Sequence, residues 1–453
     1  MRYLPVLPGL LAPLPLLATC LSTPDVVVFG QMSYVNKRPS LWKIDGKNPY
    51  TGRNTFNDIA VKYADSCQVI ENKLNVDIAL YGLAYYSYRD AGAFEKDDNR
   101  TRVLLDRFRV SYNVSSSVRL DVGKIRTKQG LFYLKSPSNL LAGYYAGFKT
   151  TRIYDPSMKQ SYFESFWGAT LAQDTQNYSL SLTVAPKLTD IDKRYESSSN
   201  WSASRRANAR ERYLLTYTDY RMDKHTPSVN LLLGDARSVA ISNSYYWTPQ
   251  FVINAGMAWH DRQQWRHMDG DKARMVERYA FPSELYGIRK KNGVELALGM
   301  QYTTDRFSQL GLEYYFQSEG YSSGQWRQQT DLVKFLNQRT NYAPLDQAFD
   351  AYKYLMASEN YNASSKGSLL GKHYINGWAS LLLADRSVIQ PYAVLNMVDA
   401  SAMLGIHYNK PLDRLDKKLD VYTGVYTALG SKHSEFGLFG EAVGTYLGFK
   451  YHF

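Results

Sequence analysis

The sequence has few cysteines, no long apolar run after its first residues and none of the common hydrolase motifs. Two cysteines in 453 residues, Cys20 and Cys67, exclude a framework of disulfides and a cysteine metal site. Beyond residue 25 no stretch of about 20 apolar residues occurs, which excludes membrane-spanning helices.

Catalysis has little support in the sequence. Seven histidines are scattered along the chain, and neither a G-x-S-x-G nor an H-E-x-x-H motif is present. His260 and Asp261 are the one adjacent pair that could serve an enzyme, and we interpret them as the end of a strand in a solvated loop. No spacing predicts a cofactor or a metal site.

Tyrosine and positive charge are abundant. The chain contains 38 Tyr, 18 Phe and 8 Trp, and 54 Lys and Arg exceed 42 Asp and Glu to give a net charge of +12. Apolar residues make up 44% of the chain, so disorder throughout is not expected. Many aromatic residues together with a mean hydropathy of −0.41 favour a β protein with aromatic girdles over a helical enzyme.

Residues 1–23 have the layout of a cleaved secretory signal peptide. Arg2 precedes a short apolar stretch, and small residues follow near Ala18. Prolines within this stretch disfavour a spanning helix. Residues 17–20 also resemble an imperfect lipoprotein box, so lipidation of Cys20 is the alternative to simple cleavage. We therefore expect an exported chain with one domain, 24–453.

Segments of about ten residues in which every second side chain is apolar recur along the chain. Between residues 294 and 302, apolar side chains at even positions alternate with Glu295, Ala297, Gly299 and Gln301. Period two over this length is typical of a tilted strand that crosses a bilayer, with apolar side chains toward lipid and polar ones toward a lumen. A soluble β-sandwich is the alternative, although its strands are usually shorter.

The pattern predicts an all-β fold, a transmembrane antiparallel β-barrel of about 18 strands. Short polar turns and long loops mostly alternate, as expected when turns face the periplasm and loops face outward. The strand near 57 is the weakest, and without it and one neighbour the barrel would have 16 strands. Two outer connections, near 234–238 and 397–400, should be short. Strands are predicted to begin near 26, 57, 74, 103, 117, 164, 177, 211, 227, 238, 250, 292, 308, 374, 387, 400, 418 and 442.

Residues 444–453 alternate in the same way and end in Phe453. Such a strand resembles the C-terminal strand that outer-membrane proteins present to the barrel assembly machinery. Together with the export signal, it predicts a protein of the Gram-negative outer membrane.

Residues 118–133 (VRLDVGKIRTKQGLFY) resemble a stretch of the phosphate-type (porin O/P) and related substrate-channel porins. Gly123-Lys124 leads into Gly130-Leu131. This sequence has Lys124 where that family usually has Arg, and Lys128 near the position where that family has Pro. The resemblance implies a porin, a homotrimer, and a following loop that folds into the pore and narrows it. Here that loop would be 128–163.

On the predicted strands, the charges that face the lumen are balanced. The six cations are Lys62, Arg107, Arg109, Arg119, Arg212 and Lys450, and the six anions are Asp58, Asp77, Asp121, Glu295, Glu313 and Asp420. Four predicted loops, 36–57, 128–163, 187–210 and 261–292, together carry an excess of 14 positive charges. These loop cations could attract anionic solutes or neutralise lipopolysaccharide phosphates.

Eight cations are the candidate pore-lining or solute-binding residues. Three of them, Arg107, Arg109 and Arg119, could form a ladder of cations in the lumen or simply pair with Asp77 and Asp121 across the strands. A break in alternation after Gly123 predicts a bulge that turns cations toward the pore. The eight candidates are Arg107, Arg109, Arg119, Lys124, Arg126, Lys128, Lys135 and Lys149.

Two further features leave alternatives open. The long loop 318–373 contains two amphipathic segments, 325–338 and 345–357, which are predicted to be helices that plug the mouth, contact a trimer neighbour or cover the rim. Six tyrosines on the lumen face could form a slide for sugars or fill space. They are Tyr81, Tyr85, Tyr315, Tyr422, Tyr426 and Tyr446.

The sequence therefore predicts a passive porin for small hydrophilic solutes, with a preference for anions and no cofactor. Its expected partners are outer-membrane lipid and lipopolysaccharide, small anionic solutes and the barrel assembly machinery, and no nucleic acid. A channel for an acidic polysaccharide and a surface adhesin or receptor barrel are the alternatives.

Overall fold

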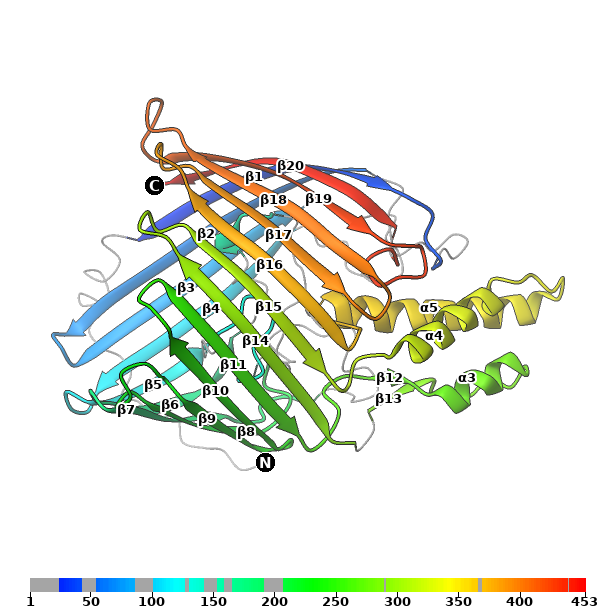
Figure 1. Cartoon of the computed structure of the whole chain (residues 1–453), viewed down its shortest axis with the longest axis horizontal. Helices are drawn as coiled ribbons and strands as arrows, with labels where there is room; N and C mark the ends of the chain where they lie inside the picture. Colours follow the sequence, from blue (N-terminus) through cyan, green and yellow to red (C-terminus); the bar gives the residue numbers. More distant parts are fainter. Residues whose placement is uncertain are drawn as a thin grey trace, which may run out of the picture.

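Eighteen antiparallel strands form one closed sheet (Figure 1). Each barrel strand pairs with the next one along the chain, and β1 (Asp25–Lys37) pairs with both β2 (Thr55–Ile70) and β20 (Glu441–His452), which closes the barrel. The structure, a computed structural model, describes residues 24–42, 54–85, 101–126, 130–141, 153–158, 165–190, 207–288, 291–365, 369–438 and 440–453.

The strand count confirms the predicted fold class and rules out the 16-stranded alternative. The weakest predicted strand is β2, which has 16 residues and pairs along its length with β1 and β3. The remaining barrel strands are β3 (Leu74–Tyr85), β4 (Thr101–Asn113), β5 (Val118–Ile125), β6 (Phe166–Asp174), β7 (Tyr178–Ala185), β8 (Arg212–Asp219), β9 (Ser228–Gly234), β10 (Ser238–Tyr246), β11 (Phe251–His260), β14 (Gly293–Thr303), β15 (Gln309–Gln317), β16 (His373–Leu382), β17 (Val388–Asn396), β18 (Ser401–Pro411) and β19 (Leu419–Leu429).

Short and long connections alternate along most of the barrel. The strand ends that the long connections join lie at one end of the barrel. β1 begins and β20 finishes at the other end, where the turns are short (Figure 1). At the long-loop end, the two short connections that the sequence predicts lie between β9 and β10 and between β17 and β18. The predicted signal peptide, 1–23, lies outside the described residues.

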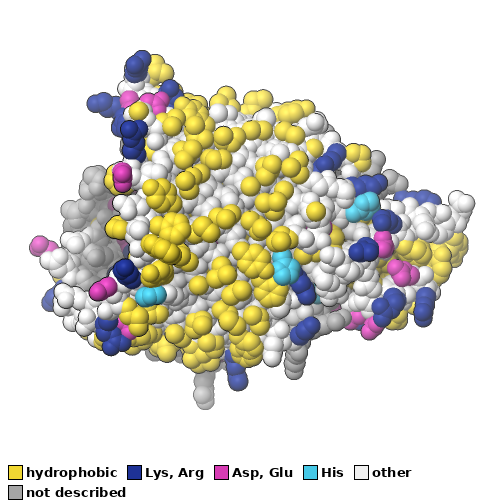
Figure 2. Space-filling view, in the orientation of Figure 1, with side chains coloured by type: hydrophobic (Ala, Val, Ile, Leu, Met, Phe, Trp, Pro, Cys, Tyr) yellow, Lys and Arg dark blue, Asp and Glu magenta, His cyan; other side chains and the backbone are white. Residues whose placement is uncertain are grey.

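The strands form because their side chains alternate between two environments that are the reverse of those in a soluble protein. In β1, Met32 and Tyr34 are 58% and 48% exposed on the outer face, whereas Gln31 and Ser33 are buried on the inner face. Figure 2 shows apolar side chains over the visible strand face and charged side chains toward the ends of the molecule. A wall that is apolar outside and polar inside suits a lipid bilayer.

Aromatic rings on the inner face lie over glycines of adjacent strands. A Cβ added to Gly444 in β20 would lie 2.2 Å from Cζ of Tyr426 in β19, and one added to Gly448 would lie 2.3 Å from Cζ of Tyr422. Only a residue without a side chain lets a ring approach a strand so closely. Glycine therefore allows these large side chains to lie against the wall.

Three helices and a small hairpin project from the long-loop end (Figure 1). They are the hairpin of β12 (His267–Met268) and β13 (Tyr286–Gly287), and the helices α3 (Gly270–Glu277), α4 (Ser323–Leu336) and α5 (Ala343–Ser365). The sequence predicts α4 and α5, and a capping box between Ser322 and Gln325 fixes the start of α4. It does not predict α3, which buries only Ala273 and Val276. None of the described helices is long and apolar enough to cross a membrane.

The projection has an apolar core of its own, separate from the barrel. Leu332, Val333 and Leu336 of α4 pack with Phe349 and Met356 of α5 in this core. Loops from the barrel rim hold the projection in place, because Trp326 Nε1 donates to the carbonyl of His433 at 2.6 Å. The predicted long loop is thus a folded unit at the mouth.

A partly buried carboxyl joins this projection to the rim. Glu435, in the loop between β19 and β20, accepts hydrogen bonds from Leu370 N at 2.9 Å, Tyr374 OH at 2.5 Å and Asn396 Nδ2 at 2.6 Å. Burial, together with the charge of Asp399, raises the pKa of Glu435 to about 7. The three hydrogen bonds oppose this shift, so the group is held close to its point of titration at neutral pH.

The contact between aromatic rings and glycines can be tested by replacing two glycines with alanine, one beneath a ring and one with room for a methyl group. We expect Gly444→Ala to lower the free energy of unfolding by about 1–3 kcal/mol, because the new methyl group overlaps the ring of Tyr426. Gly377→Ala in β16 is the matched control, since its nearest atom is Leu312 Cδ1 at 4.0 Å. Loss of the folded band on SDS gels with rising temperature measures both. Equal midpoints for the two variants would contradict this account of the wall.

Candidate functional site

The lumen contains a stretch of chain that lies against the inner wall. This inner segment, residues 130–141 and 153–158, belongs to the connection between β5 and β6. Its backbone N–H groups at Tyr133 and Leu134 donate to the two carboxylate oxygens of Glu313 in β15, at 2.6 and 2.9 Å. Asn376 Nδ2 of β16 donates to the second of these oxygens at 3.0 Å. Glu313 thus fixes the segment to the wall across the barrel from β5.

Apolar side chains of the inner segment pack on three separate parts of the inner wall. Leu140 and Leu141 pack with Phe166, Leu214 and Leu232 of the strands from β6 to β9. Phe132 and Leu134 pack against Tyr315 and Tyr374 of β15 and β16. Ile153 and Met158 pack with Val27, Phe29 and Leu83 of β1 and β3. The segment therefore contacts the wall around much of its circumference.

The predicted arginines of β4 and β5 lie on the inner wall, and Arg109 and Arg119 pair with acidic neighbours. Arg109 of β4 donates through Nε to Asp77 Oδ2 of β3 at 2.7 Å, and its NH1 lies 4.0 Å from Asp121 Oδ2 of β5. Arg119 Nε lies 3.4 Å from the same Asp121 oxygen. Arg107 faces Ala79 in the register of β3 and β4. Arg109 and Arg119 thus form one cross-strand network with Asp77 and Asp121.

Lys124 and Arg126 differ from the prediction. Lys124 is opposite Phe108 and Trp167, both on the outer face, and its buried ammonium donates to the carbonyl of Leu105 at 2.7 Å. Arg126 forms an ion pair with Asp106. These two cations are therefore bound within the wall beside β4 rather than turned freely toward the pore.

The expected bulge is in the neighbouring strand. Pairing of Gly123 is regular with Arg109 and with Gly168, whereas the register of β3 and β4 shifts at Asp106. Gly123 is nevertheless required, because it has a φ of +130° and a Cβ there would lie 2.1 Å from the carbonyl oxygen of Phe108. The placement of the bulge after Gly123 was wrong, since the extra residue that disrupts the alternation is Asp106 in the run Leu104-Leu105-Asp106.

The remaining three candidates lie in the connection that contains the inner segment. Lys135 Nζ lies 3.0 Å from Glu295 Oε1 of β14 and 5.2 Å from the centre of the Tyr315 ring. Lys128 and Lys149 lie outside the described residues, as does most of the predicted basic excess of loops 36–57 and 187–210.

Cations and anions of these pairs differ in their exposure. Side chains of Arg119, Arg109 and Lys135 are 46%, 33% and 32% exposed, while their partners Asp121, Asp77 and Glu295 are 9–10% exposed. The reason is that long cationic side chains extend past the short carboxylates that they bind. The wall that is balanced by number therefore presents mainly positive groups in these three pairs.

The tyrosines of the lumen face are buried. Tyr81, Tyr315, Tyr422, Tyr426 and Tyr446 are each at most 7% exposed. The inner segment contributes Tyr154, whose ring stacks on that of Tyr446 with centres 4.7 Å apart. This burial favours the space-filling alternative over a slide for sugars, because a slide needs exposed ring faces. The side chain of Tyr85 lies outside the described residues.

Sequence reasoning missed the anchoring role of Glu313 and Glu295. Both were predicted as lumen-facing charges, but nothing local shows that they bind a segment far away in the sequence. Asp106 was missed altogether, although the adjacent apolar pair before it marks the break in alternation. Among the described residues, no group of three or more His, Cys, Asp or Glu side chains could hold a metal ion.

The side chains of His260 and Asp261 bind different partners and do not form a hydrogen-bonded pair. His260 is buried, and its Nδ1 lies 2.8 Å from Ser238 Oγ. The carboxylate of Asp261 instead accepts from Arg237 N at 3.2 Å and Arg262 Nε at 3.4 Å. The geometry gives no catalytic pair at this position.

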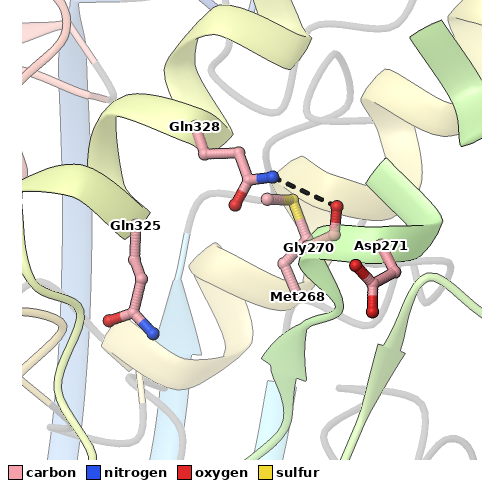
Figure 3. A pocket seen from close by; sticks show the side chains of 5 residues that line it. All are labelled: Met268, Gly270, Asp271, Gln325 and Gln328. Carbon is pink, nitrogen blue, oxygen red and sulfur yellow. Dashed lines mark hydrogen bonds between the residues drawn. The ribbon is translucent and has the colours of Figure 1, made fainter. Parts of the chain in front are cut away.

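A small polar pocket lies in the projection (Figure 3). It has a volume of about 180 Å³ and lies between the start of α3 and α4, and Gln328 Nε2 donates to the carbonyl of Gly270 at 3.1 Å across it. Its lining residues are Met268, Gly270, Asp271, Gln325 and Gln328. The pocket is far smaller than a typical small-molecule site of about 300–1,000 Å³, so the lumen is the better candidate for function.

Comparison with known proteins identifies the fold. No family model and no curated protein sequence matches the chain. Crystal structures of OccK11 (OpdR) and OccK5 (OpdH) of Pseudomonas aeruginosa each match with 11% identity and a TM-score of 0.50; they cover 95% and 96% of this chain, and 95% and 98% of their own. Wzi of Escherichia coli, described as a carbohydrate-binding β-barrel, matches with 11% identity and a TM-score of 0.49 over 96% of this chain and 86% of its own. The chain therefore has the fold of a Gram-negative substrate-channel porin.

Proposed function

We propose that this protein is an outer-membrane porin through which small hydrophilic solutes, preferentially anions, diffuse passively. The observation that carries the proposal is the unequal exposure of the paired charges: Arg109, Arg119 and Lys135 extend into the lumen, while their carboxylate partners are buried. Exposed cations in a narrow lumen raise the local concentration of anions. No catalytic step, energy source or cofactor is needed for such transport.

The inner segment supplies the constriction. It is held by Glu313 and Glu295 on one side of the barrel and by apolar contacts of Ile153 and Met158 on another. Because it crosses between β5 and the opposite wall, it leaves the basic strands β3, β4 and β5 as a polar side of the remaining passage. A solute that passes the segment would meet Arg109 and Arg119.

The outer membrane is the location that the barrel supports. Its apolar outer face suits lipid, and recognition of β20 by the barrel assembly machinery is part of the proposal. Export through residues 1–23, contact of loop cations with lipopolysaccharide and assembly as a homotrimer belong to the same proposal. The last of these rests on the family resemblance alone.

The function as a receptor or adhesin is a second candidate because the projection is a folded unit with its own core. A channel for an acidic polysaccharide is less well supported, since the lumen tyrosines are buried. Ion conductance of the purified protein separates the candidates: a porin conducts, and a blocked receptor barrel does not.

Charge selectivity tests the role of the arginines. In a planar bilayer under a salt gradient, we expect a reversal potential of the anion-selective sign. Replacing Arg107, Arg109 and Arg119 together with Gln should lower the ratio of anion to cation permeability by about two- to threefold, because the exposed cations of β4 and β5 are lost.

Arg386→Gln is the matched control, because Arg386 lies in the turn between β16 and β17, outside the lumen. It should leave the reversal potential unchanged. Unchanged selectivity in the triple variant would assign the preference to the outer loops, and a cation-selective wild type would refute the charge argument.

Substitution of Glu313 tests whether the inner segment narrows the passage. We expect Glu313→Ala to increase the single-channel conductance and its noise, because two backbone N–H groups of the inner segment lose a charged acceptor, at a cost of about 1.5–3 kcal/mol for each bond. Glu313→Gln keeps one acceptor oxygen and should give a smaller increase.

Single-channel recording measures these changes, with Glu211→Ala as the control. Glu211 is an exposed carboxyl at the rim that accepts a hydrogen bond from Tyr213 OH. Wild-type conductance in Glu313→Ala would show that the segment does not limit the passage.

A further inference from the structure

Four ionisable side chains meet where the inner segment is fixed to β14. This anchor cluster consists of Lys135, Glu295, His260 and Glu319. Lys135 Nζ lies 3.0 Å from Glu295 Oε1, and His260 Nε2 lies 3.6 Å from the same oxygen. Two nitrogens that can carry positive charge thus approach one carboxylate oxygen, from the inner segment and from β11.

Two atoms of the cluster are buried without a hydrogen-bond partner, namely His260 Nε2 and Glu319 Oε1. The other nitrogen of His260 is occupied by Ser238 Oγ, and the other oxygen of Glu319 accepts from Gln264 N at 2.8 Å. Buried polar atoms are rarely left unsatisfied, so each of these two atoms has room for a proton or a further hydrogen-bond partner.

His260 and Glu319 are also neighbours. Gly293 is opposite His260 in the pairing of β11 and β14, and a Cβ added to Gly293 would lie 2.4 Å from Glu319 Oε1. Glu319 therefore lies over the residue that pairs with His260. Protonation of either side chain changes the electrostatic potential at the other and at Glu295.

We propose, on the basis of the porin function above, that proton uptake by His260 and Glu319 controls the charge selectivity of the channel by releasing Lys135 from Glu295. At high pH the imidazole is neutral, Lys135 balances Glu295, and Glu319 leaves the cluster with a charge of −1. At low pH two protons from the solvent neutralise Glu319 and convert His260 to an imidazolium. Its Nε2–H then donates to Glu295 Oε1, and the cluster has a charge of +1.

Lys135 is the member of the cluster that can move. It is 32% exposed, whereas His260 and Glu295 are 6% and 10% exposed. When the imidazolium becomes the partner of Glu295, the ammonium of Lys135 loses its counterion and extends further into the lumen than in the paired state. Anion preference therefore increases as the pH falls.

The surroundings of the cluster allow this exchange near neutral pH. Burial raises the pKa of Glu319 to about 7, and the charge of Glu295 adds to this shift, while the Gln264 N–H, His260 and Lys135 oppose it. The ring of Tyr315 lies beneath Lys135.

Other charged groups near the cluster have their own partners. Both ring nitrogens of His267 face carbonyl oxygens, that of Trp265 at 3.0 Å and that of Glu319 itself at 2.7 Å. Asp261, the residue after His260, is bound to Arg237 N and Arg262. Glu313 holds backbone N–H groups of the inner segment.

The test is the reversal potential of the full-length protein in a planar bilayer with a potassium chloride gradient, at about pH 8.5 and about pH 5.5. We expect the ratio of anion to cation permeability of the wild type to rise by about threefold on acidification. The double variant His260→Gln/Glu319→Gln should lose this dependence. His225→Gln, in the turn between β8 and β9, should keep it.

Failure of the inference is distinguishable from failure of the proposed function. Conductance with the same selectivity at both pH values, or a full response in the double variant, overturns the inference and leaves the porin function intact. The second result would assign the response to another group, such as Glu435. Absence of conductance at both pH values overturns the porin function itself.

Thermal unfolding of Glu319→Gln gives a readout that needs no transport. A carboxyl whose pKa is raised in the folded state stabilises the fold at low pH, and this stabilisation is lost as the pH rises through about 7. The midpoint of the wild type should therefore fall relative to that of Glu319→Gln between about pH 5 and pH 8. A difference in midpoint that is constant with pH would overturn the titration of Glu319.

Discussion

Closure of the sheet between β1 and β20 is the constraint on which the rest of the molecule depends. A closed sheet has no edge, so every strand finds two partners and its backbone polar groups are satisfied without water. Closure also divides the side chains of each strand into two sets, one toward the outside and one toward the lumen. The side chains that face the lumen cannot reach lipid or another layer of protein. The sequence must therefore supply other partners for their polar groups and other contacts for their apolar surface.

The inner segment answers that question in two ways. Its leucines, Phe132, Ile153 and Met158 cover the apolar patches of the inner wall, and its backbone and Lys135 satisfy two carboxylates. A lumen that was filled only with water would leave these apolar patches exposed, at a cost of about 25 cal/mol for each Å². Narrowing of the passage is thus a consequence of how the inner wall is buried. It does not need a separate device.

The strands could be predicted from the sequence, because the period of two and the turn residues are local signals. The contacts of the inner wall could not, because they join residues that are distant in sequence: Tyr133 and Glu313 are 180 positions apart. The same holds for Tyr422, which was correctly placed on the inner face but whose burial depends on Gly448 in the next strand. Helix α3 carries too few apolar residues to be recognised, and it is held in place by the neighbouring helices. Sequence therefore predicts which face a residue occupies, and the three-dimensional pairing decides whether solvent reaches it.

The positive charge of the chain shows why this distinction matters for function. Counting predicts a neutral wall, with as many acidic as basic residues facing the lumen. In the pairs of Arg109 and Arg119 the structure separates the two signs by depth, since Asp77 and Asp121 lie at the wall and the two guanidinium groups extend beyond them. A passing ion interacts most strongly with the nearest charges, because the interaction weakens with distance and with the salt in between. The depth of each charge, more than the net charge of the wall, is therefore the basis on which we propose that a balanced barrel prefers anions.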